Sequence, residues 1–168
     1  LRHPELAQRS CVVSSFGKTY HCTGWKLGYC VAPPALSAEF RKVHQYVTFC
    51  SFNPAQHALA RMMREHPEHH RELPGFYQAK RERFRALLAD TPLRLLPVAG
   101  TYFQLARYAA ISDLGDAAFC EYLTRDVGVA AIPVSAFFAD GRDEHVIRFC
   151  FAKNEATLAA ACTRLAAL

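Results

Sequence analysis

The sequence contains no long apolar run, no pair of cysteines at C-x-x-C spacing and no extended basic face. Because no signal peptide, membrane-spanning run or lipidation motif can be recognised, we expect no membrane association. The run Arg81, Arg83 and Arg85 fits the solvated side of a helix, so we expect no nucleic-acid partner either. The seven cysteines are an odd number, and several lie among apolar residues, where a free thiol behaves as a small hydrophobe. We therefore expect a reducing, cytoplasmic location.

A convincing metal site is also missing from the sequence. The densest group of potential ligands is the stretch 66–70, where one helical turn could bring His66 and His70 together. However, Pro67 and the polar surroundings favour a solvated helix start. A metal site needs a closed set of ligands and a second layer of hydrogen bonds, and nothing in the stretch supplies them. The sequence therefore predicts no bound metal.

The apolar content is nevertheless sufficient for a folded core. Of the 168 residues, 51% are hydrophobic and 21% are charged, which is typical of soluble globular proteins rather than disordered ones. The length allows one ordinary domain or two small ones.

Helical and extended patterns alternate along the chain, which favours α/β layers. The apolar residues 11–13 predict a short buried strand. In the second half of the chain, strands are predicted over 101–106 and 146–152, and Asn154 is predicted to cap a closing helix.

The middle of the chain carries a candidate domain boundary. Pro74 is predicted to open a helix that continues to about Asp90, because proline is favoured in the first helical turn. We place the boundary near Leu73, which divides the chain into two expected domains, 1–73 and 74–168.

An arginine interrupts the apolar strand predicted near the C-terminus. Period-two alternation puts Val146 and Cys150 on the same face as Arg148, and the apolar residues between them on the other. Burying an unpaired guanidinium is costly, so Arg148 must meet an anion or solvent. Three interpretations follow: an internal salt bridge, an exposed edge strand, or a site for a bound anion.

Residues 14–28 contain several side chains that could bind a ligand. They read Ser-Ser-Phe-Gly-Lys-Thr-Tyr-His-Cys-Thr-Gly-Trp-Lys-Leu-Gly, so that small residues crowd Lys18 and a second lysine, Lys26, follows. With nothing bulky at Ser15 or Gly17, a bound group can approach closely. Two lysines and a hydroxyl could hold one phosphorylated molecule; a turn with two solvated lysines is the alternative.

This pattern closely resembles the cofactor-lysine motif of the class I/II aminotransferases that depend on pyridoxal 5'-phosphate (PLP). The resemblance implies that Lys18 forms the covalent link to PLP, while Ser15 and Lys26 contact its phosphate. Many members have arginine where Lys26 stands, and a lysine acts there as a point charge rather than a bidentate fork. The family also carries an arginine in a matching C-terminal strand, which implies that Arg148 binds the α-carboxylate of the substrate.

Two further segments, 100–103 and 131–137, are similar to the subgroup of methionine, glutamine and kynurenine aminotransferases. In the first segment, Tyr102 and Phe103 could border the substrate pocket, although packing of an aromatic strand explains them equally well. The resemblance runs from about Cys11 to the C-terminus.

The resemblance implies an α/β fold: the C-terminal part of the fold-type I large domain, followed by the small C-terminal α/β domain. Residues 1–73 are then part of the PLP-binding large domain, and residues 74–168 form the small domain that carries Arg148. Because the chain begins at Leu1 rather than methionine and reaches the lysine motif at once, we expect it to be a fragment. The family's acidic partner for the pyridine nitrogen lies upstream of the lysine, so we expect this chain alone to be weak or inactive.

The function implied is transfer of an amino group from an amino acid, such as methionine, glutamine or kynurenine, to a 2-oxo acid. The full-length enzyme is expected to be a homodimer. Two alternatives stay open: a PLP-dependent C–S β-lyase, and a non-catalytic aminotransferase-like domain of a transcription regulator.

Overall fold

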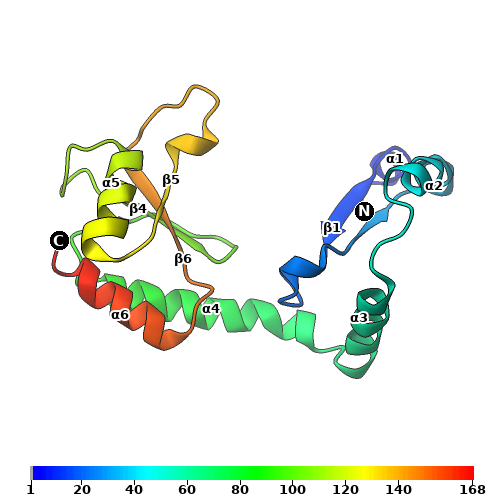
Figure 1. Cartoon of the computed structure of the whole chain (residues 1–168), viewed down its shortest axis with the longest axis horizontal. Coiled ribbons are helices and arrows are strands. Elements are labelled where there is room, and N and C mark those ends of the chain that lie inside the picture. Colours follow the sequence, from blue (N-terminus) through cyan, green and yellow to red (C-terminus); the bar gives the residue numbers. More distant parts are fainter. Residues whose placement is uncertain (1) are drawn as a thin grey trace. The chain divides into compact units, whose positions relative to one another are not determined.

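The computed structural model of the chain describes residues 2–168, so Leu1, the first residue of the first expected domain, lies outside the described part. The chain divides into two compact units, Leu1–Leu73 and Pro74–Leu168 (Figure 1). The assignment of these two stretches to a cofactor-binding and a carboxylate-binding domain stays a prediction.

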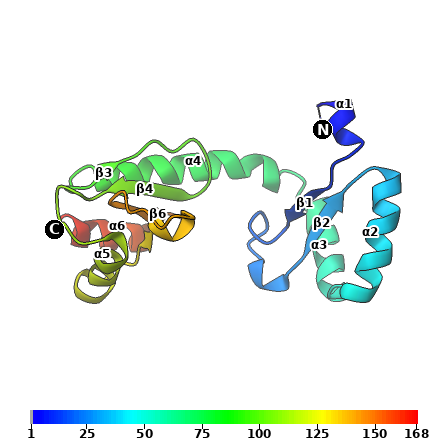
Figure 2. The same ribbon diagram turned by 90° about the horizontal axis from the view of Figure 1, so that it is seen from above.

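The first unit is built on one β-hairpin. Strands β1 and β2 pair antiparallel, in a register that runs from Val12 opposite Val31 to Ser15 opposite Gly28 (Figure 2). The elements of this unit are α1 (Pro4–Ala7), β1 (Val12–Ser15), a 3-10 turn (Thr23–Trp25), β2 (Gly28–Val31), α2 (Pro34–Val47) and α3 (Asn53–Glu65).

The core of the first unit is small and does not lie under β1. Its buried hydrophobic residues are Leu27, Ala55 and Leu59, with Phe16, Tyr20 and Cys22 packed against them. The helix α3 therefore covers the loop between the two strands rather than the strands themselves. The prediction of a buried strand at 11–13 was wrong for this reason: the strand begins at Val12, and Val13 is 75% exposed.

The second unit is organised around a four-stranded antiparallel sheet with the order β3-β4-β6-β5. Its elements are α4 (His69–Leu88), which begins before the division between the units, β3 (Arg94–Leu95), β4 (Phe103–Arg107), α5 (Asp116–Tyr122), a π-type turn (Leu123–Val127), β5 (Ile132–Pro133), a 3-10 turn (Ser135–Phe137), β6 (Val146–Cys150) and α6 (Glu155–Leu165).

The helices of the second unit cover one face of this sheet. Ile147 and Phe149 of β6 are buried in one cluster with residues of α4, α5 and α6, such as Leu88, Phe119 and Leu158. Arg148, which points to the other face, is only half-buried. The predicted alternation is thus confirmed for these residues, but Val146, predicted to lie beside Arg148, is also buried, with 4% exposure.

The ends of two helices test the sequence rules for helix starts. Asn154 caps α6 as predicted, since its side chain accepts a hydrogen bond of 2.8 Å from the backbone N–H of Thr157. Pro74 does not open a helix; it lies inside α4, which begins at His69. The helix starts earlier because the carbonyl of Glu68 accepts hydrogen bonds from the N–H groups of Arg71 and Glu72. Proline has no N–H, and α4 tolerates the loss of one backbone hydrogen bond at Pro74.

Within residues 2–168, no group of three or more His, Cys, Asp or Glu side chains is arranged to hold a metal ion. The histidines singled out in the sequence make other contacts: His66 Nδ1 lies 3.3 Å from Glu68 Oε1, and His69 bonds a backbone carbonyl. None of the helices in the described part is both long and apolar enough to cross a membrane.

Candidate functional site

The hairpin of the first unit brings Ser15, Lys18 and Lys26 to one end of a ribbon. Ser15 pairs with Gly28, and the N–H of Phe16 donates to the carbonyl of Leu27 across 3.1 Å, which closes the ribbon. Residues 16–27, here called the lysine loop, therefore begin and end side by side at the end of the hairpin. The strand pairing therefore places the predicted cofactor residues at the same end of one hairpin.

Backbone hydrogen bonds inside the lysine loop give it a defined shape around Gly17. The carbonyl of Gly17 accepts from the N–H of Cys22 at 3.0 Å and from the hydroxyl of Thr23 at 3.3 Å. A Cβ at Gly17 would lie 3.0 Å from the Cα of Thr23, so a larger residue would force these two turns apart. A side chain at position 17 is thus disfavoured by this close backbone contact.

Within residues 2–168, the two lysines of the loop have no side-chain partner. Lys18 and Lys26 are exposed, and in the described residues neither ammonium donates a hydrogen bond or lies within 4.0 Å of a carboxylate. Lys26 also has a φ of 55°, in the left-handed region that non-glycine residues seldom adopt. Both positive charges are therefore available to a negatively charged ligand.

Ser15 is engaged with the backbone of the same turn. Its hydroxyl accepts from the N–H of Gly17 at 3.0 Å and donates to the carbonyl of Leu27 at 3.3 Å. The second bond is long, and a phosphate oxygen would have to replace that carbonyl as the acceptor.

A histidine that the sequence did not single out for this role supports the lysine loop. His69 Nε2 lies 2.7 Å from the carbonyl oxygen of Thr19, the residue after Lys18. Because a carbonyl only accepts, this ring nitrogen must carry the proton. The ring also stacks on Tyr20, with centroids 5.3 Å apart. The sequence did not predict this contact, because His69 lies 50 positions after Thr19 and its own neighbours are polar.

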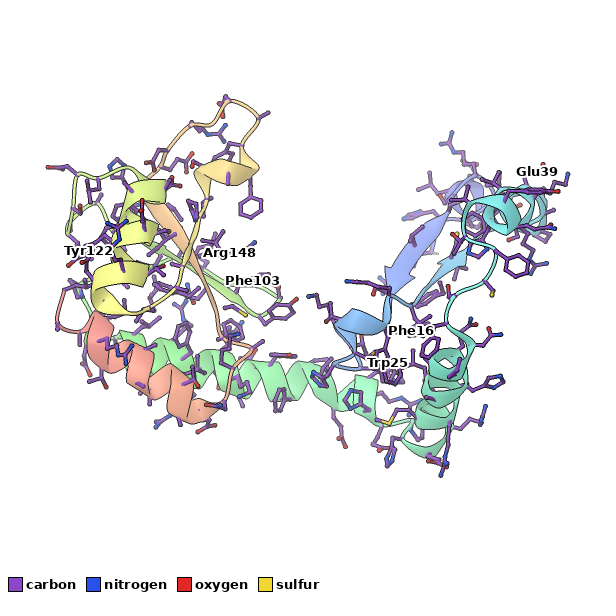
Figure 3. All side chains as sticks on the ribbon, viewed as in Figure 1. Phe16, Trp25, Glu39, Phe103, Tyr122 and Arg148 are labelled. Atoms are coloured by element: carbon purple, nitrogen blue, oxygen red, sulfur yellow. The ribbon has the colours of Figure 1, made fainter. Side chains whose placement is uncertain are left out.

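In the second unit, Arg148 lies in the middle of the sheet. Its strand, β6, is flanked by β4 and β5, with Arg148 opposite Leu105 on one side and Ile132 on the other. The guanidinium carbon lies 4.1 Å from the ring centre of Phe103 and 4.7 Å from that of Phe137. Arg148 and Phe103 are labelled in Figure 3. Cation–π contact with two rings holds the guanidinium in place without neutralising its charge.

Two of the three interpretations of Arg148 are overturned by these contacts. Since β6 is flanked on both sides, Arg148 does not lie on an edge strand. In residues 2–168 no carboxylate lies within 4.0 Å of it, so it forms no internal salt bridge there, and its Nε is buried without a hydrogen-bond partner. A buried donor on a charged group is costly to leave unpaired, which favours the third interpretation, a site for a bound anion.

The aromatic residues of the predicted pocket have different roles. Phe103 contacts the guanidinium of Arg148, as expected for a residue that borders the site. Tyr102 instead packs against Tyr77, with ring centres 5.7 Å apart, which is a packing role. Phe137 was part of a recognised segment but was not singled out, because nothing in its local sequence places it over Arg148.

The donor set fits PLP and an amino-acid substrate. A primary amine, a second ammonium group and a hydroxyl share one loop in the first unit, which suits a phosphorylated carbonyl compound. The half-buried guanidinium of Arg148 in the second unit, which pairs with no carboxylate within residues 2–168, suits a carboxylate ligand.

Comparison with known proteins agrees with this chemistry. Residues 2–165 match the family model of the class I and II aminotransferases. Methionine aminotransferase of Escherichia coli strain K12 is 56% identical over 165 residues, which are 98% of this chain and 43% of that protein. Kynurenine–oxoglutarate transaminase of Dictyostelium discoideum is 32% identical over 92% of this chain and 40% of its own length.

Solved structures show the same relationship. The crystal structure of YbdL from Escherichia coli, described as having a methionine aminotransferase function, superposes with a TM-score of 0.94 at 56% identity, covering 99% of this chain and 44% of that one. N-succinyldiaminopimelate aminotransferase from Mycobacterium tuberculosis gives a TM-score of 0.88 at 34% identity, with coverage of 99% and 44%. The mixed α/β fold is therefore the expected one, and the chain spans less than half the length of these relatives.

Proposed function

The chain belongs to the class I and II aminotransferases, and from this membership we propose that the whole protein is a PLP-dependent aminotransferase. It transfers the amino group of an amino acid to a 2-oxo acid. Among methionine, glutamine and kynurenine as donors, we favour methionine, because the 56% identical relative is a methionine aminotransferase. The observation that carries the proposal is the half-buried guanidinium of Arg148, which forms no side-chain hydrogen bond or ion pair within residues 2–168 and therefore calls for an anion such as the carboxylate of an amino acid.

The roles of the first unit follow from its free charges. When bound, PLP supplies an electron sink that stabilises negative charge at the substrate Cα. With PLP bound, the amine of Lys18 would hold the cofactor and, when free, would serve as the base that accepts the proton from the substrate Cα. Lys26 and Ser15 bind the phosphate; Lys26 supplies the charge and Ser15 a hydroxyl whose present bond is weak.

The role of Arg148 is to orient the substrate. Its guanidinium offers parallel N–H donors to the two oxygens of a carboxylate, and such pairing fixes direction as well as distance. Phe103 and Phe137 restrain the guanidinium so that it need not be ordered when the substrate arrives.

The remaining expectations belong to this proposal. Residues 1–73 are part of the PLP-binding large domain and residues 74–168 are the small domain. The whole protein works as a homodimer in the cytoplasm. The named aminotransferases among its relatives favour this function over a C–S β-lyase or an effector domain of a transcription regulator.

The test of the proposal is the substitution Lys18→Ala in the whole protein. We expect kcat for transfer from methionine to a 2-oxo acid to fall by roughly 10²–10⁴-fold, the usual contribution of a positioned proton-transfer group. The matched control is Lys42→Ala, which removes an exposed lysine of α2 paired only with Glu39. Unchanged turnover in Lys18→Ala would contradict the assignment. Release of pyruvate and ammonia from a cysteine S-conjugate, without an amino acceptor, would indicate a C–S β-lyase instead.

A further inference from the structure

A buried carboxylate in the second unit lies outside the site described so far. Asp116, the first residue of α5, is only 2% exposed. Its two oxygens accept hydrogen bonds of 2.7 Å from the backbone N–H and from the hydroxyl of Ser135. In residues 2–168 no Lys, Arg or His nitrogen lies within 4.0 Å of it, so it is a buried carboxylate without a cation. We call Asp116 and Ser135 the carboxylate latch.

A second carboxylate ties the latch to the strand of Arg148. Asp143 accepts the N–H of Asp116 with one oxygen and the N–H of His145 with the other, both at 2.7 Å. The contact leaves no spare room, since a Cβ on Gly115 would lie 3.2 Å from Asp143 Oδ2. The start of α5 is thus fixed to the segment that leads directly into β6.

The latch holds the short turn that carries Phe137. Ser135 is the first residue of the 3-10 turn Ser135–Phe137. Phe137 itself is 61% exposed, so the packing of its own ring does little to hold it. Its ring nevertheless lies 4.7 Å from the guanidinium carbon of Arg148. The bonds from Ser135 to Asp116 are therefore the side-chain contacts that anchor this turn to α5.

A buried carboxylate without a cation lowers stability unless its hydrogen bonds compensate, and an apolar residue could fill the same space at less cost. We propose that Asp116 is a positioning residue for substrate binding: through Ser135 it holds Phe137 over Arg148, so that the guanidinium keeps the orientation that a substrate carboxylate needs. This inference rests on the proposed function, in which Arg148 binds that carboxylate.

The experiment compares Asp116→Asn with Asp126→Asn in the whole protein. The asparagine keeps the size of Asp116 but carries no charge, so the two charge-assisted bonds to Ser135 are replaced by weaker neutral ones. Asp126 is an exposed carboxylate at the end of the same helical segment and is the matched control. For Asp116→Asn we expect KM for methionine to rise about tenfold with kcat within about twofold, the size of one charged hydrogen bond. Asp126→Asn should change neither.

A binding measurement separates orientation of the carboxylate from general damage. Calorimetry would use two fragments of the substrate, methionine lacking its amino group and methionine lacking its carboxylate. We expect Asp116→Asn to raise the Kd of the first fragment about tenfold and to leave that of the second unchanged. Equal weakening of both fragments would overturn the proposal. If Asp116→Asn does not fold, Ser135→Ala carries the same expectation with a smaller rise, because its N–H bond remains.

A double substitution tests whether Asp116 acts through Phe137. In a protein that already carries Phe137→Ala, adding Asp116→Asn should raise KM no further, because the group that the latch positions is gone. Full additivity would contradict the proposal. Arg148→Ala distinguishes the two levels: if it does not weaken binding of the carboxylate fragment, the proposed function of Arg148 fails. If it does and Asp116→Asn does not, the positioning role alone is wrong.

Discussion

The two units of the chain differ in how much core supports their chemistry. In the second unit, fifteen buried hydrophobic residues contributed by helices, strands and loops form one cluster. In the described part of the first unit, the corresponding cluster consists of Leu27, Ala55 and Leu59. Arg148 therefore rests on a well-packed sheet, whereas Lys18 lies on a loop held mainly by backbone hydrogen bonds.

The first unit also leaves large apolar side chains in solvent. Tyr46, Val47, Phe49 and Phe52, which lie in or after α2, are each at least 66% exposed. Apolar surface that stays exposed to solvent contributes no hydrophobic stabilisation. We infer that the second unit is the more stable part of the chain, and that the lysine loop depends on a few contacts whose loss would be felt directly.

The largest effect is expected from Phe151→Ala in the second unit. Phe151 is fully buried and packs against Phe84, with ring centres 6.2 Å apart. We expect the free energy of unfolding to fall by about 4 kcal/mol, as for other buried phenylalanines. Urea unfolding followed by circular dichroism measures it. Phe52→Ala, at a position 66% exposed in the first unit, is the control, and a comparable loss there would break the contrast between the units.

A smaller effect, confined to the first unit, is expected from Leu59→Ala. Leu59 is 5% exposed and belongs to the small cluster under the lysine loop. We expect a loss of about 3 kcal/mol. Trp25 is the only tryptophan of the chain and lies in this unit, so its fluorescence reports the transition. The fluorescence midpoint should move with Leu59→Ala but not with Phe151→Ala; a joint shift would mean that the units unfold together.

The sequence predicted the second unit better than the first, and the reason lies in particular residues. The alternation around Arg148 correctly placed Ile147 and Phe149 in the core, because the residues that cover this face of β6 belong to the same unit of the chain. The cap at Asn154 is equally local. For residues 11–13, in contrast, apolar character alone predicted burial, and Val13 is 75% exposed because nothing in the described structure packs on that strand.

The site was predicted in part. Spacing and resemblance point to Ser15, Lys18 and Lys26, whose cofactor roles stay a prediction, and the hairpin places the three at one end of a ribbon. The contacts that hold the site were missed, because they join positions far apart in the sequence: His69 with Thr19, and Asp116 with Ser135. A single sequence carries no signal for such pairs, because nothing in the local pattern of either residue indicates its distant partner.

A third prediction concerns the geometry of the lysine loop. A Cβ at Gly28 would lie 2.5 Å from the carbonyl oxygen of Ser14, directly across the hairpin. We expect Gly28→Ala to lower the stability of the first unit by about 2 kcal/mol, because the strands must move apart. Gly24→Ala is the matched control, since a Cβ there meets nothing within 4 Å. Equal effects of the two substitutions on the Trp25 transition would show that the hairpin contact does not matter.

The smallest effect tests whether stability in the second unit also depends on local contacts. Asn154→Ala removes the side-chain acceptor for the N–H of Thr157 at the start of α6. Loss of such a cap costs about 1 kcal/mol. Because Leu158, Cys162 and Leu165 of α6 remain buried in the large cluster, we expect the circular dichroism midpoint to fall slightly while the Trp25 fluorescence midpoint stays constant. Serine at the same position should restore most of the loss, since its hydroxyl can accept the same hydrogen bond. A loss of stability as large as that of Phe151→Ala would mean that α6 is held by its cap rather than by the core. The buried residues of α6 would then contribute less to the stability of the second unit than their burial indicates.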